Sequence, residues 1–222
     1  MSRREANKEL KREKIIIAAR EIISSQGMDK LTMRYLAEKA EVSSRTPYNL
    51  FESKTDILVA IIFDAFKHLR LPANNDNQQL LIEQLIQLPS LVKHFLANDH
   101  DFYRDVLWGI MSSDAKLTRD TATSSITEII STLMIDAVKE KECSDKLKVE
   151  IISYHLNTQF LSIIGMWGGS QLELDEAIAN IQYGWTNTLL QHCTRKSKSW
   201  LNQAQETYAK ALEESLAHSS DC

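Results

Sequence analysis

Three helix-capping positions and one very short gap dominate residues 32–58, TMRYLAEKAEVSSRTPYNLFESKTDIL. Thr32, Ser43 and Ser53 each stand directly before a helical run, where a side-chain oxygen can accept a hydrogen bond from unpaired first-turn N–H groups. Only two residues separate the end of the first run from the Ser43 cap. Such a gap leaves room for one sharp turn, so the stretch predicts a helix-turn-helix whose second helix covers residues 44–51.

A longer helix precedes this motif and ends at Gly27, a residue type that commonly stops helices. Leu31 and Leu36 bracket the Thr32 cap at the spacing of a hydrophobic staple. The first helix shows an apolar stripe with helical periodicity, formed by Ile15, Ile16, Ala19, Ile22 and Ile23. This stripe needs a partner, and we expect it to pack against the apolar side of the helix-turn-helix.

Charge is distributed unevenly along the 222 residues, although the net charge is only −4. Residues 1–60 hold 12 Lys/Arg and 9 Asp/Glu, which gives +3, whereas residues 61–222 hold 14 and 21, which gives −7. A basic head on an acidic body is typical of a protein that meets phosphate with one end only. Residues 2–14 lean basic, and they are either a solvated helix start or an arm that reaches DNA phosphates.

Composition indicates a helical protein of the cytoplasm. Gly (6) and Pro (3) are scarce, and no apolar run approaches the roughly 20 residues that cross a bilayer. The N-terminus is charged and lacks the apolar core of a signal peptide. The three cysteines, Cys143, Cys193 and Cys222, have wide spacing and an odd count, which predicts neither a disulfide framework nor a zinc site.

About 50 residues of the head resemble one family of regulators. The order is a helix ended by Gly27, followed by Leu31-Thr32, Leu36-Ala37, Ala40-x-Val42-Ser43, Thr46-x-Tyr48, Phe51, Lys54 and Leu58. This ordered set is similar to the N-terminal head of TetR-type transcriptional regulators. The resemblance implies an all-α fold with a three-helix DNA-binding head, residues 1–55, and a helical body, residues 56–222, that dimerises and often holds a small-molecule effector.

Two residues depart from the family pattern. Glu41 stands at a turn position that is often Gly because it tends to be left-handed, and a side chain there costs about 1–2 kcal/mol. Pro47 stands where a larger apolar residue is common. With Ser43 as the cap, Pro47 is the fourth helical residue and removes the N–H that would bond the Ser43 carbonyl. It also disfavours helical geometry at Thr46.

The second helix of the motif is the predicted DNA recognition helix. An arginine fork in its first turn can bond guanine O6 and N7 together, so Arg45 is the main candidate for sequence reading. The predicted base-contacting residues are Ser44, Arg45, Thr46 and Asn49. The predicted phosphate-contacting residues are Thr32, Arg34, Ser43, Tyr48 and Lys54, of which Tyr48 has packing in the head's core as an alternative. One head offers few contacts, so the motif implies a homodimer on a roughly palindromic double-stranded operator.

Helical patterns continue through the body. They predict helices over residues 54–71, 78–88, 90–97 with a break or kink at Pro89, 101–111, 116–140, 146–167, 175–196 and 200–217. The helices over 146–167 and 175–196 are apolar over a wide arc and resemble the pair that forms a four-helix dimer interface in the family. The last helix carries a narrow apolar stripe, which predicts packing on the body or on the partner.

Bulky residues of the middle helices are candidates for an effector pocket suited to an apolar or aromatic molecule. They are Phe102, Tyr103, Trp108, Met111, Tyr154, Phe160, Met166 and Trp167. Core packing is the commoner role of such residues. The isolated His94, His100 and Asp101 lack metal-ligand spacing, so no metal and no cofactor is expected. No catalytic grouping or phosphate loop is readable, so an enzyme is not expected.

Three functions fit these features. The first is a dimeric repressor that a small molecule releases from its operator. The second is a DNA-bound helical scaffold that a protein partner, or nothing, controls. The third is a helical small-molecule carrier or enzyme whose head has lost DNA binding, which Pro47 and the negative net charge alone favour.

Overall fold

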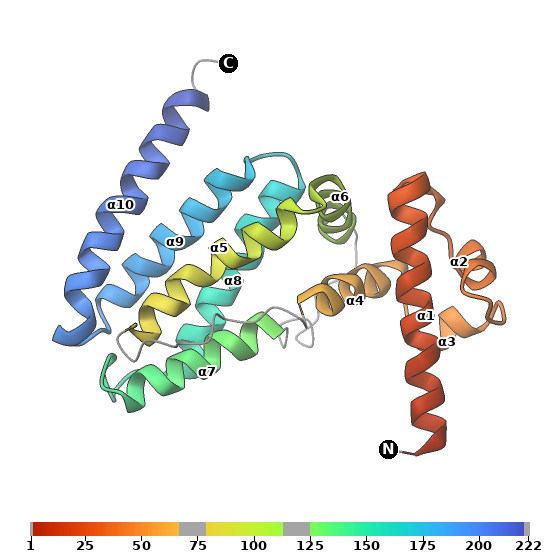
Figure 1. Cartoon of the computed structure of the whole chain (residues 1–222), viewed down its shortest axis with the longest axis horizontal. Coiled ribbons are helices and arrows are strands. Elements are labelled where there is room, and N and C mark those ends of the chain that lie inside the picture. The colour runs from red at the N-terminus through yellow and green to blue at the C-terminus, as the bar shows by residue number, and fades with distance from the viewer. Residues whose placement is uncertain (1, 67–78, 113–124, 220–222) are drawn as a thin grey trace. The chain divides into compact units, whose positions relative to one another are not determined.

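The computed structural model describes residues 2–66, 79–112 and 125–219. These residues form the helices α1–α10 and a short 3-10 turn, η1, and none of them belongs to a β-strand (Figure 1). The predicted all-α fold is confirmed. The described residues group into two compact units, the first made of everything up to Phe66 together with α6, and the second of α5 and α7–α10. The functional division into a head of residues 1–55 and a body of residues 56–222 stays a prediction.

The first unit is built around the longest helix of the head. Its elements up to Phe66 are α1 (Arg3–Gln26), η1 (Met28–Lys30), α2 (Met33–Lys39), α3 (Thr46–Leu50) and α4 (Lys54–Phe66). The predicted apolar stripe of α1 is buried, as are the staple residues Leu31 and Leu36. Gly27 ends α1 with a φ of 84°, a conformation that favours glycine. Both α2 and α3 pack on α1 and appear on the same side of it in Figure 1.

Helix α6 (His100–Met111) completes this unit although it lies far along the chain. Gly109 lets it approach closely. A Cβ on Gly109 would lie 2.8 Å from Leu58 Cδ1 and 3.2 Å from Met28 Cε, distances that side chains do not tolerate without moving. The small residue therefore permits α6 to pack against both α4 and η1.

The second unit is a bundle with α9 in its middle. It contains α5 (Leu81–Ala97), α7 (Ser125–Lys139), α8 (Val149–Gly168), α9 (Leu174–Leu190) and α10 (Arg195–Ser219). Helix α9 packs against α5, α8 and α10. Its Trp185 is fully buried, and the indole Nε1 donates a hydrogen bond to the Leu156 carbonyl of α8 at 3.0 Å. A buried indole with its N–H satisfied anchors the two helices at little polar cost.

Several helix bounds differ from those predicted. Helix α5 runs through Pro89 without interruption, so the predicted break there is wrong, and the alternative of a kink at Pro89 stays a prediction. Helix α9 ends at Leu190 rather than at 196, because the residues after it pair with another segment. Helix α10 begins at Arg195 rather than at 200. The predicted end of a helix at 71 and the predicted start of a helix at 116 lie outside the described residues.

Candidate nucleic-acid interface

The turn between α2 and α3 is tight and left-handed, as predicted. Glu41 has a φ of 53°, and its N–H donates to the Glu38 carbonyl at 3.1 Å. The next N–H, that of Val42, donates to the Ala37 carbonyl at 3.0 Å. These two bonds satisfy carbonyls at the end of α2, in the manner of a left-handed helix cap.

The start of α3 differs from the prediction. The helix spans Thr46–Leu50 rather than 44–51, and the Ser43 carbonyl accepts from the Thr46 N–H at 2.8 Å. The Ser43 and Thr46 hydroxyls also lie within hydrogen-bond distance, 2.8 Å. Pro47 is thus the second helical residue rather than the fourth, a position whose N–H has no helical partner in any case. The expected loss of a hydrogen bond at Pro47 does not occur.

The residues predicted to read bases lie at the exposed surface of this turn and helix. Ser44, Arg45 and Asn49 are exposed, whereas Thr46 is half-buried and engaged with Ser43. The Tyr48 side chain is 63% exposed, so its ring does not pack in the head's core. A basic side chain, an amide, hydroxyls and a phenol therefore share one accessible surface, the combination that meets base edges and phosphates.

The predicted phosphate residues have roles within the head as well. Thr32 Oγ1 accepts from the Tyr35 N–H at 3.2 Å and so caps α2, as predicted. Lys54 is half-buried, and its Nζ donates to the Met28 carbonyl of η1 at 2.9 Å. Arg34 is exposed. Of these three residues, Arg34 is the one whose substitution would test a phosphate contact with the least effect on the stability of the head.

The start of α4 is capped reciprocally. Ser53 Oγ accepts from the Asp56 N–H at 3.1 Å, while Asp56 Oδ2 accepts from the N–H groups of Ser53 and Glu52 at 3.0 Å each. The predicted Ser53 cap is confirmed, and Asp56 at the N3 position adds the second half of a capping box.

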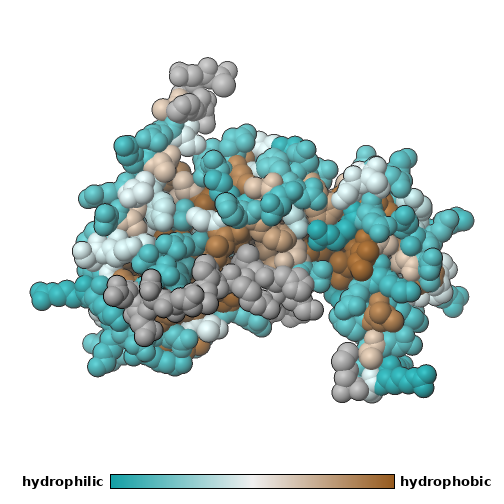
Figure 2. All heavy atoms as spheres, in the orientation of Figure 1, coloured by the Kyte–Doolittle hydropathy of each residue, from teal (hydrophilic) through white to brown (hydrophobic). Residues whose placement is uncertain are grey.

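The basic N-terminal segment forms the first turns of α1. Ser2 and Glu5 form a capping box at its start, and their hydrogen bonds hold the pKa of the Glu5 carboxyl below its usual value. Figure 2 shows hydrophilic residues at the N-terminal end of α1, where the charged side chains are exposed. A helical segment exposed in this way is compatible with both readings of residues 2–14.

Sequence reasoning missed a role for Arg12. Its guanidinium carbon lies 4.3 Å from the centre of the Phe51 ring, and its Nη1 donates to the Leu50 carbonyl at 3.3 Å. Arg12 thus connects α1 to the last turn of α3. The contact joins residues 38 and 39 positions apart, so local spacing gives no sign of it.

Two of the residues predicted to line a pocket lie beside α1 in the first unit. The Arg20 guanidinium faces the rings of Phe102 at 5.0 Å and Tyr103 at 5.8 Å, and its Nη2 donates to the Tyr103 hydroxyl at 3.2 Å. Trp108 and Met111 of the same helix are exposed. This arrangement holds α6 on α1 through one cation and two aromatic rings.

The other four predicted pocket residues lie on α8 in the second unit. Phe160 and Trp167 are buried, whereas Tyr154 and Met166 are exposed. The eight residues therefore fall in two groups, one in each unit, and a pocket that they line together stays a prediction.

A few buried polar side-chain atoms in the second unit have no hydrogen-bond partner among the described residues. Ser153 Oγ and Asn157 Oδ1 lie one turn apart on α8, and Gln84 Nε2 lies on α5. Leaving such atoms unpaired costs about 1–3 kcal/mol each. The burial of these atoms depends on the packing of α5 and α8, which the local sequence does not reveal.

Thr32 caps α2, whereas α3 begins after Arg45 without a side-chain cap, so the predicted Ser43 cap is wrong. The two helices, the tight turn between them and their exposed polar and basic surface have the arrangement of a helix-turn-helix DNA-binding head. Residues 15–61 match the family model described as bacterial regulatory proteins, tetR family. Residues 15–61 are accordingly the DNA-binding head of the tetR family, a class of DNA-binding regulators rather than of enzymes. None of the curated proteins compared with the chain matches it.

Solved structures share this fold at low sequence identity. A TetR transcriptional regulator from Rhodococcus sp. RHA1 is 15% identical with a TM-score of 0.62, over 86% of this chain and 98% of that one. RolR in complex with resorcinol is 14% identical with a TM-score of 0.62, over 91% and 95%. FadR of Thermus thermophilus in complex with lauroyl-CoA is 16% identical with a TM-score of 0.61, over 77% and 90%. At these identities the likeness shows the fold.

None of the described helices is both long and apolar enough to cross a membrane.

Proposed function

We propose that this regulator is a homodimeric repressor that binds a roughly palindromic operator through α2 and α3 and leaves it when a small molecule binds the body. The observation that carries the DNA-binding part is the exposed surface formed by Ser44, Arg45, Tyr48 and Asn49 on the tight turn and second helix of the pair. Two copies are needed because a single head buries too little surface for tight, specific binding.

Exposed apolar side chains on α8 support the dimer. The residues that made α8 and α9 look apolar over a wide arc, such as Leu156 and Ile181, are buried within the chain itself. Ile151 and Tyr154, in contrast, are 59% and 62% exposed on α8. A second copy of α8 would remove these side chains from water.

The partnerless polar atoms of Ser153 and Asn157 support a small-molecule effector, since a ligand with a hydrogen-bonding group would satisfy them. RolR and FadR, which share the fold, were solved with resorcinol and with lauroyl-CoA, respectively. We infer an effector that is largely apolar or aromatic and carries at least one polar group.

Coupling would pass through α4, which follows the recognition helix directly in the chain. An effector that favours a head spacing unsuited to adjacent major grooves would weaken operator binding. A coupling free energy of about 1–3 kcal/mol changes affinity about 5- to 150-fold.

Selection of duplexes from a random pool, with the DNA flanking the protein's own gene as a second source, tests operator binding. Arg45→Ala should relax base preference at one position in each half-site, whereas Arg34→Gln should weaken all sequences alike. In a dimer, losing two phosphate contacts should reduce the slope of log K against log salt by about 1.8. Equal binding of every duplex by the unchanged protein would exclude a sequence-specific regulator.

The oligomeric state is tested by light scattering and native mass spectrometry. Ile151→Asp should shift the protein towards monomer, and Ile135→Asp on α7, where Ile135 is 45% exposed, is the matched control that should not. Native spectra of the purified protein would also reveal a retained effector. A dimer that both substitutions leave intact would place the interface elsewhere than on α8.

A further inference from the structure

Two cysteines that lie 50 residues apart in the chain meet in the second unit. The Sγ atoms of Cys143 and Cys193 are 3.5 Å apart, and both thiols are free. Cys143 follows α7 and Cys193 precedes α10, so neither lies within a helix. The two residues face each other across an isolated antiparallel β-bridge.

The backbone around the pair has the geometry that a disulfide needs. The Thr194 N–H donates to the Glu142 carbonyl and the Ser144 N–H to the His192 carbonyl, each at 2.9 Å. These bonds flank the cysteines, which makes them a non-hydrogen-bonded pair, whose Cα atoms are typically about 4.5 Å apart. Disulfides span Cα separations of about 4.4–6.8 Å. Rotation of the two side chains is therefore enough to close the bond.

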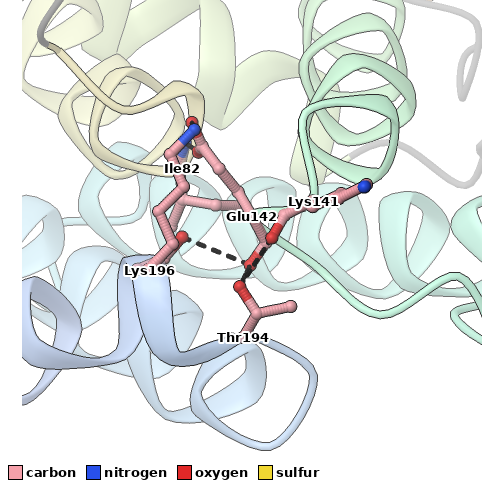
Figure 3. Close-up of polar contacts among 6 residues, drawn as sticks. Ile82, Lys141, Glu142, Thr194 and Lys196 are labelled. Atoms are coloured by element: carbon pink, nitrogen blue, oxygen red, sulfur yellow. Dashed lines mark hydrogen bonds and ion pairs between the residues drawn. The ribbon is translucent and has the colours of Figure 1, made fainter.

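A buried carboxylate next to Cys143 holds this junction together (Figure 3). Glu142 is 3% exposed, and its Oε2 accepts from the Ile82 N–H at the start of α5 at 3.0 Å. The Lys196 Nζ of α10 lies 3.7 Å from Glu142 Oε1. The carboxylate thus ties the α7–α8 connection to the first turns of α5 and α10.

Hydroxyls of the α9–α10 connection and of the first turn of α10 bind the backbone of the same segment. Thr194 Oγ1 donates to the Lys141 carbonyl at 2.6 Å, and Ser197 Oγ to the Glu142 carbonyl at 3.2 Å. Both segments that carry a cysteine are consequently fixed against each other. Such fixing keeps the two thiols at a high effective concentration and makes their reaction with each other intramolecular.

We propose that the Cys143–Cys193 pair is a reversible oxidation site at which a hydroperoxide converts the two thiols into an intrachain disulfide. With hydrogen peroxide, the Cys193 sulfur attacks one peroxide oxygen, the O–O bond breaks, and a sulfenic acid and one water form. The Cys143 sulfur then attacks the sulfenic sulfur and displaces hydroxide, which takes the Cys143 proton and leaves as a second water. Two electrons pass from the thiols to the peroxide.

Accessibility assigns the order of these steps. Cys143 is 2% exposed, whereas Cys193 is half-buried and meets the oxidant first. The hydrogen bond with Cys143, burial, and the nearby Glu142 charge raise the pKa of the Cys193 thiol, and only Lys198 acts in the opposite direction. Because the thiolate is the nucleophile, the site reacts slowly at neutral pH and records sustained rather than brief exposure to oxidant.

The oxidised chain would have the α7–α8 connection joined covalently to the α9–α10 connection. The proposal does not rest on DNA binding or on an effector, since it concerns two thiols within one unit.

Oxidation of the native full-length protein tests it. In a Cys222→Ser background, which removes the third thiol of the sequence, the reduced protein is treated with hydrogen peroxide at pH 8. We expect the intact mass to fall by the mass of two hydrogen atoms. After unfolding, an alkylating reagent should label no free thiol in the oxidised protein, compared with two in the reduced protein. A peptide linking Cys143 to Cys193 should appear, and reductant should restore both thiols.

Cys193→Ser in the same background is the matched control, and circular dichroism verifies that it folds. It should show no loss of two hydrogens. The proposal is overturned if the native protein keeps both thiols under oxidant that consumes them in the urea-unfolded chain. It is equally overturned if Cys193 gains two oxygens without forming the linked peptide, or if the disulfide forms only between chains.

Discussion

Arg12 offers the sharpest test of how the recognition helix is held. It stacks on Phe51 at 4.3 Å and donates to the Leu50 carbonyl at 3.3 Å, both at the end of α3. A half-buried cation–π contact contributes about 1 kcal/mol, and a long hydrogen bond from a charged donor about 0.5–1 kcal/mol. Removing both should destabilise the closed form of α3 by about 1.5–2 kcal/mol, which corresponds to roughly 10- to 30-fold more frequent opening.

Hydrogen exchange of the full-length protein measures this opening directly. In Arg12→Gln, the Phe51 amide, which donates to the Pro47 carbonyl at 2.9 Å, should lose protection by that factor. Amides of α2 should change much less. Lys11→Gln is the control, because it removes the same charge from the exposed neighbouring position.

Arg12→Lys distinguishes the positioning of α3 by the guanidinium from a simple effect of the positive charge. Lysine keeps the cation but lacks the planar fork that stacks and bonds. It should lower protection of α3 while leaving the salt dependence of DNA binding unchanged. Protection of Phe51 equal to that of the unchanged protein in both Arg12 variants would refute the positioning role. A salt slope that falls in Arg12→Gln with protection intact would indicate a phosphate contact instead.

Three further substitutions test individual contacts through the free energy of unfolding measured in urea. Glu41→Gly should stabilise the protein by up to about 1 kcal/mol, because the φ of 53° favours glycine, and a loss of stability would contradict the left-handed turn. Gly184→Ala should destabilise by about 1–3 kcal/mol, since the Gln159 side chain occupies the space of the new Cβ, and Gln159→Ala should recover most of the loss. Glu142→Ala should cost about 2–3 kcal/mol because it leaves the buried Ile82 N–H without its acceptor, and Glu142→Gln, which keeps an acceptor, should cost clearly less.

Features encoded by neighbouring residues were predictable from the sequence. The Thr32 and Ser53 caps, the end of α1 at Gly27 and the left-handed turn at Glu41 each depend on side chains or backbone within four residues. The ordered set of such features indicated the family, which the match to residues 15–61 supports.

Features that depend on distant partners were not predictable. Helix α9 ends at Leu190 because Cys193 pairs with Cys143, and no pattern within residues 175–196 indicates that pairing. Phe102 and Tyr103 looked like pocket residues, but a cation 83 positions away from Tyr103 on α1 engages both rings. In each case the helical pattern of the sequence shows where the residue lies on its helix but not which distant residue it contacts, and that contact decides what the residue does.

The shortness of α3 changes how the head must read DNA. A helix of five residues is not stable on its own, because formation of its first turn is unfavourable without tertiary contacts. Its stability comes instead from the burial of Pro47 and Phe51 and from the contacts of Arg12 with Leu50 and Phe51. Arg45, the main candidate for base reading, lies just before the first helical residue, so the turn rather than the helix sets its direction. Sequence preference should therefore be more sensitive to changes at the turn and at Arg12 than to changes in the helical propensity of α3.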